Sequence, residues 1–187
     1  QLAWRIPDLQ PHTAILTQQM PLDYETDLGM TAALNWMYDS EPDSPDLPYA
    51  MLYTEKRLGG DALPELGPGV SMRLPFRTIE FVGSTSQVIA VHVPADGCLR
   101  VFDPAFDDAV TYSVLPESIT AAIPLSDPSR ILTSTPTRNL PDPPFTGEPD
   151  HAWCYFYEKA ELSRQLRDWG GIIAVRADAA RAGVWAM

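Results

Sequence analysis

The densest group of side chains that could bind a cation or transfer a proton is acidic. Asp103, Asp107 and Asp108 lie within six residues, directly after a segment predicted to be a strand. Carboxylates at the end of a strand often bind divalent cations or act as general acids and bases. This pattern would make the chain a stand-alone, metal-dependent hydrolase. The favoured interpretation is simpler: a solvated turn in which Asp103 caps the following residues.

Histidines and sequence motifs add no further candidate for catalysis. His12, His92 and His151 lie in three distant segments, and none stands beside a carboxylate or a cysteine at metal-ligand spacing. The sequence contains no Gly-x-Ser-x-Gly, His-Glu-x-x-His, P-loop or dinucleotide-binding pattern. We therefore assign no catalytic residue and expect no cofactor.

Aromatic side chains are concentrated near the C-terminal end. Trp153, Tyr155, Phe156 and Tyr157 fall within five residues of a predicted helix. Most such clusters form core, here between the helix and the predicted sheet. The alternative is an exposed aromatic platform that binds a peptide or a sugar. These four residues are the candidate binding residues.

Two cysteines, Cys98 and Cys154, are too few for a disulfide scaffold or a four-cysteine zinc site. They could form one disulfide in an oxidising compartment, or remain two buried free thiols. Their spacing alone leaves both possibilities open.

The overall charge excludes one class of partner. The chain has 187 residues with 13 Lys and Arg against 25 Asp and Glu, a formal net charge of −12. A chain this acidic is repelled by nucleic acid and by anionic lipid surfaces. No stretch approaches the ~20 apolar residues of a membrane span, and no signal-peptide pattern is present.

The elements that must position these residues are short, as the 19 prolines suggest. Periodicity predicts strands over 13–17 and 49–53, and a helix over 28–38 with Asp27 as its N-cap. A three-strand antiparallel meander is expected over 73–81, 87–93 and 98–102. A short helix over 115–123 and an edge strand over 131–133 complete the predicted first domain, residues 1–138.

The C-terminal part has a different pattern. Residues 139–150 form a Pro-rich linker or wrapping segment. Helical spacing over 152–167, a break over 168–171 and an alanine-rich helix over 172–181 predict an αα-hairpin spanning residues 151–187. Its size and its small residue Ala160 are similar to one tetratricopeptide-type repeat. A single repeat cannot bury its own face, so it must dock on the sheet or continue into further repeats. The predicted class is α+β: a small mixed or antiparallel sheet with a packed helix, plus this hairpin.

Five segments together resemble a known kind of protein. In order they are residues 1–7, 31–38, 77–85, 98–103 and 147–162. This order is similar to the soluble part of large multi-span membrane proteins of Chloroflexi-type bacteria, which are uncharacterised or glycosyltransferase-like. The resemblance covers nearly the whole chain.

The resemblance implies a location and a role. It implies a domain on the extracytoplasmic face of the cell membrane, tethered at its N-terminal side to membrane helices. That oxidising side raises the expectation of a Cys98–Cys154 disulfide. The catalytic carboxylate of such transferases lies in a loop between membrane helices, so none is carried over. The leading hypothesis is a non-catalytic accessory domain that recognises a glycan acceptor or a protein partner. A plain protein-interaction module in a repeat array is a further alternative.

Overall fold

The computed structural model describes residues 1–18, 26–39, 44–55, 66–94, 97–107, 115–133 and 150–184. Its centre is a four-stranded sheet in the order β4-β2-β7-β8, formed by β4 (Tyr49–Tyr53), β2 (Thr13–Thr17), β7 (Val88–His92) and β8 (Arg100–Val101). β2 runs parallel to both β4 and β7, whereas β8 is antiparallel to β7. The sheet is therefore mixed, and the predicted α+β class is confirmed.

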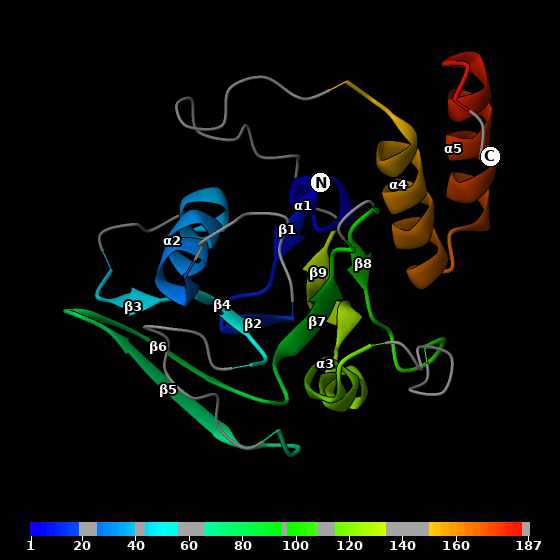
Figure 1. Ribbon diagram of the computed structural model, residues 1–187. Helices are drawn as coiled ribbons and strands as arrows, with labels where there is room; N and C mark the ends of the chain where they lie inside the picture. Colours follow the sequence, from blue (N-terminus) through cyan, green and yellow to red (C-terminus); the bar gives the residue numbers. More distant parts are fainter. Residues whose placement is uncertain are drawn as a thin grey trace.

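The sheet is covered on both faces, which explains why its strands are apolar without alternation. On one face, α2 (Asp27–Tyr38) contributes Met30 and Leu34 to a core that contains Ile15 of β2. On the other face, α3 (Glu117–Ala122) and the hairpin of β5 (Ser71–Phe76) and β6 (Ile79–Ser84) pack against the sheet. Figure 1 shows α2 and α3 on different sides of these strands.

Of the predicted antiparallel meander over 73–81, 87–93 and 98–102, the pairing of the last two strands is confirmed, because β7 and β8 are antiparallel neighbours, but the pairing of the first two is wrong. A turn with Arg77 at φ 63° divides the first predicted strand into β5 and β6. β6 then pairs in parallel with β3 (Asp46–Leu47) in a separate three-stranded sheet. β7 instead pairs with β2 in the central sheet. The physical reason is that Val88–Val91 is buried on both faces, and only an interior strand of a covered sheet offers such a position.

A ladder of polar side chains on α2 covers the outer edge of β4. Asp27, Thr31 and Asn35 are spaced four residues apart and so share one helix face. Asn35 accepts a hydrogen bond from the Tyr49 amide at 3.1 Å, and Thr31 Oγ1 accepts one from the Met51 amide at 3.0 Å. Edge strands expose unpaired backbone groups that can template aggregation. These side chains supply hydrogen-bond partners for the backbone amides on the outer edge of β4.

The N-cap predicted for this helix is also wrong. Thr26, not Asp27, caps α2, because Thr26 Oγ1 accepts a hydrogen bond from the Gly29 amide at 3.1 Å. The Asp27 carboxylate is used instead on β4, where it accepts from the Tyr53 amide at 3.0 Å.

The remaining short elements connect the beginning of the chain with the residues near position 130. The helix α1 (Leu2–Arg5) leads into β1 (Asp8–Leu9), which pairs antiparallel with β9 (Ile131–Leu132). The 3₁₀ turns η1 (Ile123–Leu125) and η2 (Pro128–Arg130) precede β9. Arg130 is buried and donates to Thr13 Oγ1 at 2.8 Å, which joins this region to the start of β2.

The C-terminal hairpin consists of α4 (Trp153–Gln165) and α5 (Trp169–Arg181), which lie side by side (Figure 1). The second helix begins three residues earlier than predicted. Asp168 caps it by accepting a hydrogen bond from the Gly171 amide at 2.8 Å. A Cβ on Gly171 would lie 2.4 Å from the Asp168 carboxylate, so a side chain here would displace the capping group. Of the predicted 139–150 linker, only Asp150 lies within the described residues.

Candidate binding face of the C-terminal hairpin

The inner face of α4 attaches the hairpin to the rest of the molecule. A disulfide joins Cys154, in the first turn of α4, to Cys98, just before β8, with a Cα–Cα distance of 5.0 Å. One turn later, Glu158 Oε1 accepts a hydrogen bond from the Leu99 amide at 3.0 Å. Leu162, one turn further, enters the core that contains Ile15 and Leu34. Positions 154, 158 and 162 share one helix face, so this face is fully used for attachment.

The same inner face buries two charged side chains. Arg5 of α1 and Glu158 are both fully inaccessible to solvent. Burial raises the pKa of the Glu158 carboxyl to about 7, against the lowering effect of the Leu99 amide and of Arg5. Burial likewise lowers the pKa of Arg5 to about 10. Arg5 donates to Gln165, but Glu158 Oε2 and two Arg5 nitrogens have no hydrogen-bond partner among the described residues.

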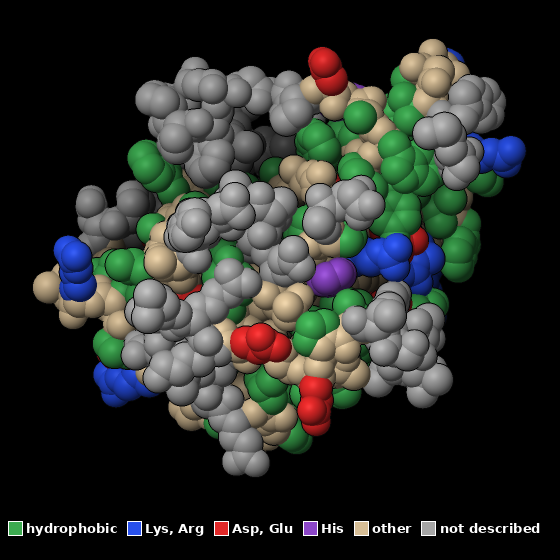
Figure 2. All heavy atoms as spheres, in the orientation of Figure 1, with side chains coloured by type: hydrophobic (Ala, Val, Ile, Leu, Met, Phe, Trp, Pro, Cys, Tyr) green, Lys and Arg blue, Asp and Glu red, His purple; other side chains and the backbone are tan. Residues whose placement is uncertain are grey.

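The outer face of the hairpin carries an apolar groove between α4 and α5. Its volume is about 340 Å³. On the face shown in Figure 2, hydrophobic side chains gather over these two helices. Small alanine side chains alternate with aromatic and branched ones, and one basic side chain is present. The lining residues are Trp153, Phe156, Tyr157, Ala160, Ile172, Val175, Arg176, Ala179, Ala180 and Val184.

The apolar surface extends beyond the groove along α5. Trp169, Ile173, Arg176 and Ala180 are spaced at i, i+4, i+7 and i+11, so they share a face. The last two line the groove, while Trp169 is 60% exposed and Ile173 is 69% exposed. Ala179 is the one buried residue of α5. The apolar surface therefore continues from the groove onto the exposed side of α5.

The hairpin also differs in charge from the rest of the chain. Residues 150–184 carry five Lys or Arg and five Asp or Glu, so the whole net charge of −12 lies elsewhere. Only Arg176 brings a formal charge into the groove lining. Burial raises the pKa of the Tyr157 hydroxyl, and the carboxylate of Glu161 adds to this, so Tyr157 remains a neutral donor.

Three of the four predicted binding residues meet in this groove. Trp153, Phe156 and Tyr157 line it, and Trp153 is 42% exposed. Tyr155 points elsewhere: its ring stacks on His151 with centroids 3.5 Å apart and meets Trp4 edge-on at 5.3 Å. Tyr155 therefore helps to hold α4 against α1. The aromatic cluster is divided between attachment and exposed surface.

The predicted acidic cluster forms a turn. Asp107 Oδ2 accepts a hydrogen bond from the Asp103 amide at 2.8 Å, and Asp103 Oδ1 accepts one from the Ala105 amide at 2.9 Å. The guanidinium of Arg164 lies 4.6 Å from the centre of the Phe106 ring in the same turn. Asp108 lies outside the described residues. Among the described residues, no group of three or more His, Cys, Asp or Glu could hold a metal ion.

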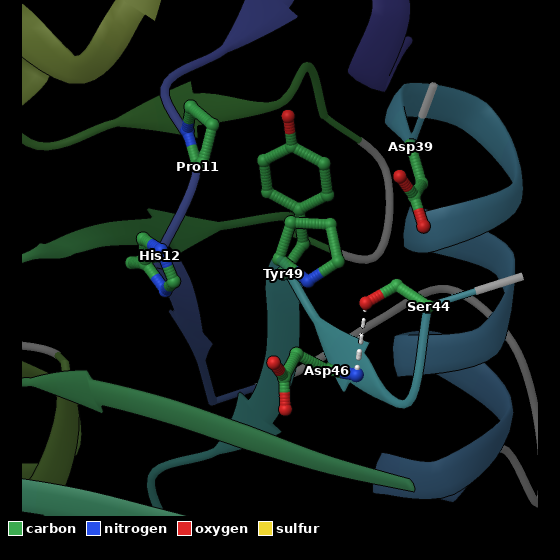
Figure 3. A pocket seen from close by; sticks show the side chains of 7 residues that line it. Pro11, His12, Asp39, Ser44, Asp46 and Tyr49 are labelled. Atoms are coloured by element: carbon green, nitrogen blue, oxygen red, sulfur yellow. Dashed lines mark hydrogen bonds between the residues drawn. The ribbon is translucent and has the colours of Figure 1, made fainter. Parts of the chain in front are cut away.

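A second cavity, of about 350 Å³, lies where β2, β3 and β4 begin (Figure 3). His12 there has φ 60° and donates its amide to the Pro48 carbonyl at 2.7 Å. Ser44 Oγ accepts from the Asp46 amide at 3.1 Å. The lining contains two carboxylates and no Lys or Arg, so its chemistry is opposite to that of the hairpin groove. The lining residues are Pro11, His12, Asp39, Ser44, Asp46, Pro48 and Tyr49.

The other two histidines stand apart from this cavity. His92, at the end of β7, stacks on Phe102 with centroids 6.5 Å apart. Burial lowers the pKa of His92, and the positive charge of Arg100 lowers it further. His151 is exposed beside Tyr155. The three histidines belong to three separate environments in the fold.

Sequence reasoning missed the half of the groove that α5 supplies. The signal was present in Ile172, Val175, Arg176 and Ala179, which follow the i, i+3, i+4, i+7 spacing of an amphipathic helix. Spacing shows that such residues share a face, but not whether that face is covered.

Comparison with known proteins adds no relative, because no family model, no curated protein and no solved structure matches the chain. Among the residues that the structure describes, no helix is both long enough and apolar enough to span a membrane.

Proposed function

We propose that this chain is a non-catalytic accessory domain that binds an apolar helical segment of a protein partner in the groove between α4 and α5. The observation that carries the proposal is the groove itself, with its aromatic, aliphatic and alanine lining and the single charge of Arg176. An amphipathic helix with apolar side chains at i, i+3, i+4 and i+7 fits such a groove. A carboxylate on that helix would meet Arg176 at the rim.

The proposal includes a setting. The domain belongs to a membrane glycosyltransferase-like protein and lies on the extracytoplasmic face, as the sequence resemblance implies. The Cys98–Cys154 disulfide supports an oxidising compartment, because structural disulfides persist in such compartments and are rare in the cytosol. The disulfide also fixes α4, so that the groove is presented by an anchored helix.

A labelled helical peptide tests the groove. We would use an amphipathic peptide with leucines at i, i+3, i+4 and i+7 and one glutamate, and follow its fluorescence anisotropy. We expect saturable binding that Trp153→Ala weakens at least tenfold, because this change removes an exposed aromatic wall of the groove. Far-UV circular dichroism establishes that the variant remains folded.

Trp36 provides a matched control. It is also an exposed tryptophan, 58% accessible, but it lies on α2, away from the hairpin groove. Trp36→Ala should leave peptide binding unchanged. Equal affinity for the wild type and a folded Trp153→Ala variant would refute the proposed surface. Trp153-dependent binding of a soluble oligosaccharide, without binding of the peptide, would show that the groove serves a glycan instead.

A further inference from the structure

We infer that the partner that fits the outer face of the hairpin is a second copy of this chain, so that two domains associate through α4 and α5. The inference rests on the proposed function, because it names the occupant of the same groove. Two-fold association needs a surface that complements itself: a projection and a hollow on one face, each meeting its counterpart. The outer face of the hairpin has both.

The projection and the hollow lie side by side. Ile173 and Trp169 project into solvent from the exposed side of α5. The hollow is the adjacent groove, which includes the small side chains of Ala160, Ala179 and Ala180. Its volume is about 340 Å³. Inserting Ile173 of each copy into the groove of the other removes both apolar surfaces from water.

Charge selects this face over others for self-association. Residues 150–184 have no net charge, while the rest of the chain carries all of the −12. Two copies that approach through any acidic surface repel each other. The hairpin projects from one side of the sheet with α5 outermost, so pairing through it keeps the acidic parts apart (Figure 1).

The size of the face sets the strength of association. A helix of 13 residues is about 20 Å long, and two helices about 10 Å apart give a footprint of roughly 400 Å² per copy. Stable complexes bury about 800 Å² per partner, so this face is about half that size and the dimer is weak. Attachment to a membrane would strengthen it by raising the effective concentration.

Sedimentation equilibrium tests the inference across roughly 5 to 500 μM protein, a range chosen to span weak association. We expect the weight-average mass to rise from the monomer value of 20.7 kDa toward twice that value. Ile173→Asp should keep the mass at that of the monomer, because it places a charge at the centre of the face. Ala174→Asp, an equally charged substitution at an exposed position about 100° further around α5 that does not line the groove, should still dimerise. Added salt should strengthen the wild-type dimer by screening the acidic parts.

The outcomes separate this inference from the function on which it rests. A wild type that remains monomeric throughout, yet binds the helical peptide with dependence on Trp153, overturns the dimer and leaves the proposed function standing. A dimer that persists in Ile173→Asp, or that Ala174→Asp disrupts equally, also overturns the inference. Loss of both dimer and peptide binding in a folded wild type refutes both.

Discussion

The two faces of α4 reverse the usual relation between polarity and burial. On the inner face, the chain buries a carboxylate, Glu158, beside a buried guanidinium, Arg5. On the outer face, an indole and an apolar groove are open to solvent. Polar groups are costly to bury, and large apolar surfaces are costly to expose. The difference teaches that the inner face attaches the hairpin through a disulfide, the hydrogen bond from the Leu99 amide to Glu158 and the core residue Leu162. The apolar face is left open to solvent.

The largest expected effect comes from breaking the inner face covalently. Replacing Cys98 and Cys154 by serine should lower the free energy of unfolding by about 4 kcal/mol, because the disulfide closes a loop with a sequence separation of 56 residues. Urea denaturation monitored by circular dichroism measures the change. A reducing agent should destabilise the wild type similarly and leave the double variant unaffected. A difference below about 1 kcal/mol would mean that the other inner-face contacts suffice.

A pH-dependent effect should come from Glu158. Its pKa is raised from 4.5 to about 7, so between these pH values the folded protein retains a proton that the unfolded chain has lost. The free energy of unfolding therefore falls as pH rises through this window, and the cost is complete above pH 7. Glu158→Gln removes the titration, and we expect the variant to be about 2 kcal/mol more stable than the wild type at pH 8.

Thermal denaturation from pH 5 to pH 8 measures this effect, and the advantage of Glu158→Gln should shrink toward pH 5. Glu161→Gln makes the same chemical change one turn later on α4. Glu161 is paired with Arg164 at 2.7 Å, so its replacement should lower stability slightly at pH 8, by less than about 1 kcal/mol. Stability changes of opposite sign for the two variants at pH 8 would support a burial cost specific to Glu158. A pH-independent effect of Glu158→Gln would contradict it.

The smallest effect is expected on the outer face. Ile173→Ser should change the free energy of unfolding by less than about 0.5 kcal/mol at dilute, monomeric concentration, because the side chain is already in water. Leu162→Ala, on the inner face of α4, should lower the free energy of unfolding by about 3 kcal/mol, since Leu162 belongs to the core. Urea denaturation of both variants gives the comparison. A cost above 1 kcal/mol for Ile173→Ser would show that the outer face supports the hairpin itself.

Local elements were predictable because they depend on residue type and spacing. The strands over 13–17 and 49–53 are confirmed at the predicted limits, and the helix over 28–38 is confirmed with one added residue. Strand order was not predictable, because apolar character at 88–91 shows burial but not which strand lies beside it. The Asp27, Thr31, Asn35 ladder also has no apolar period, so its role on the edge of β4 could not be inferred.

The candidate site was half predictable. Aromatic density identified Trp153, Phe156 and Tyr157, but could not show that Tyr155 turns toward Trp4. The start of α5 was missed because Gly170 and Gly171 weaken helix propensity, whereas the Asp168 cap needs the space that glycine leaves. Whether the two cysteines pair depends on their approach in space, which a separation of 56 residues does not specify.

The Cys98–Cys154 bond also decides how the domain transmits mechanical force. A pull applied to the outer face of the hairpin enters α4 and crosses the disulfide to Cys98, beside β8 and the central sheet. The polypeptide between these cysteines runs in parallel with that covalent link and carries little of the load. A force on the hairpin would therefore reach the residues beside the sheet through the disulfide. Reduction would transfer the load to the chain between them.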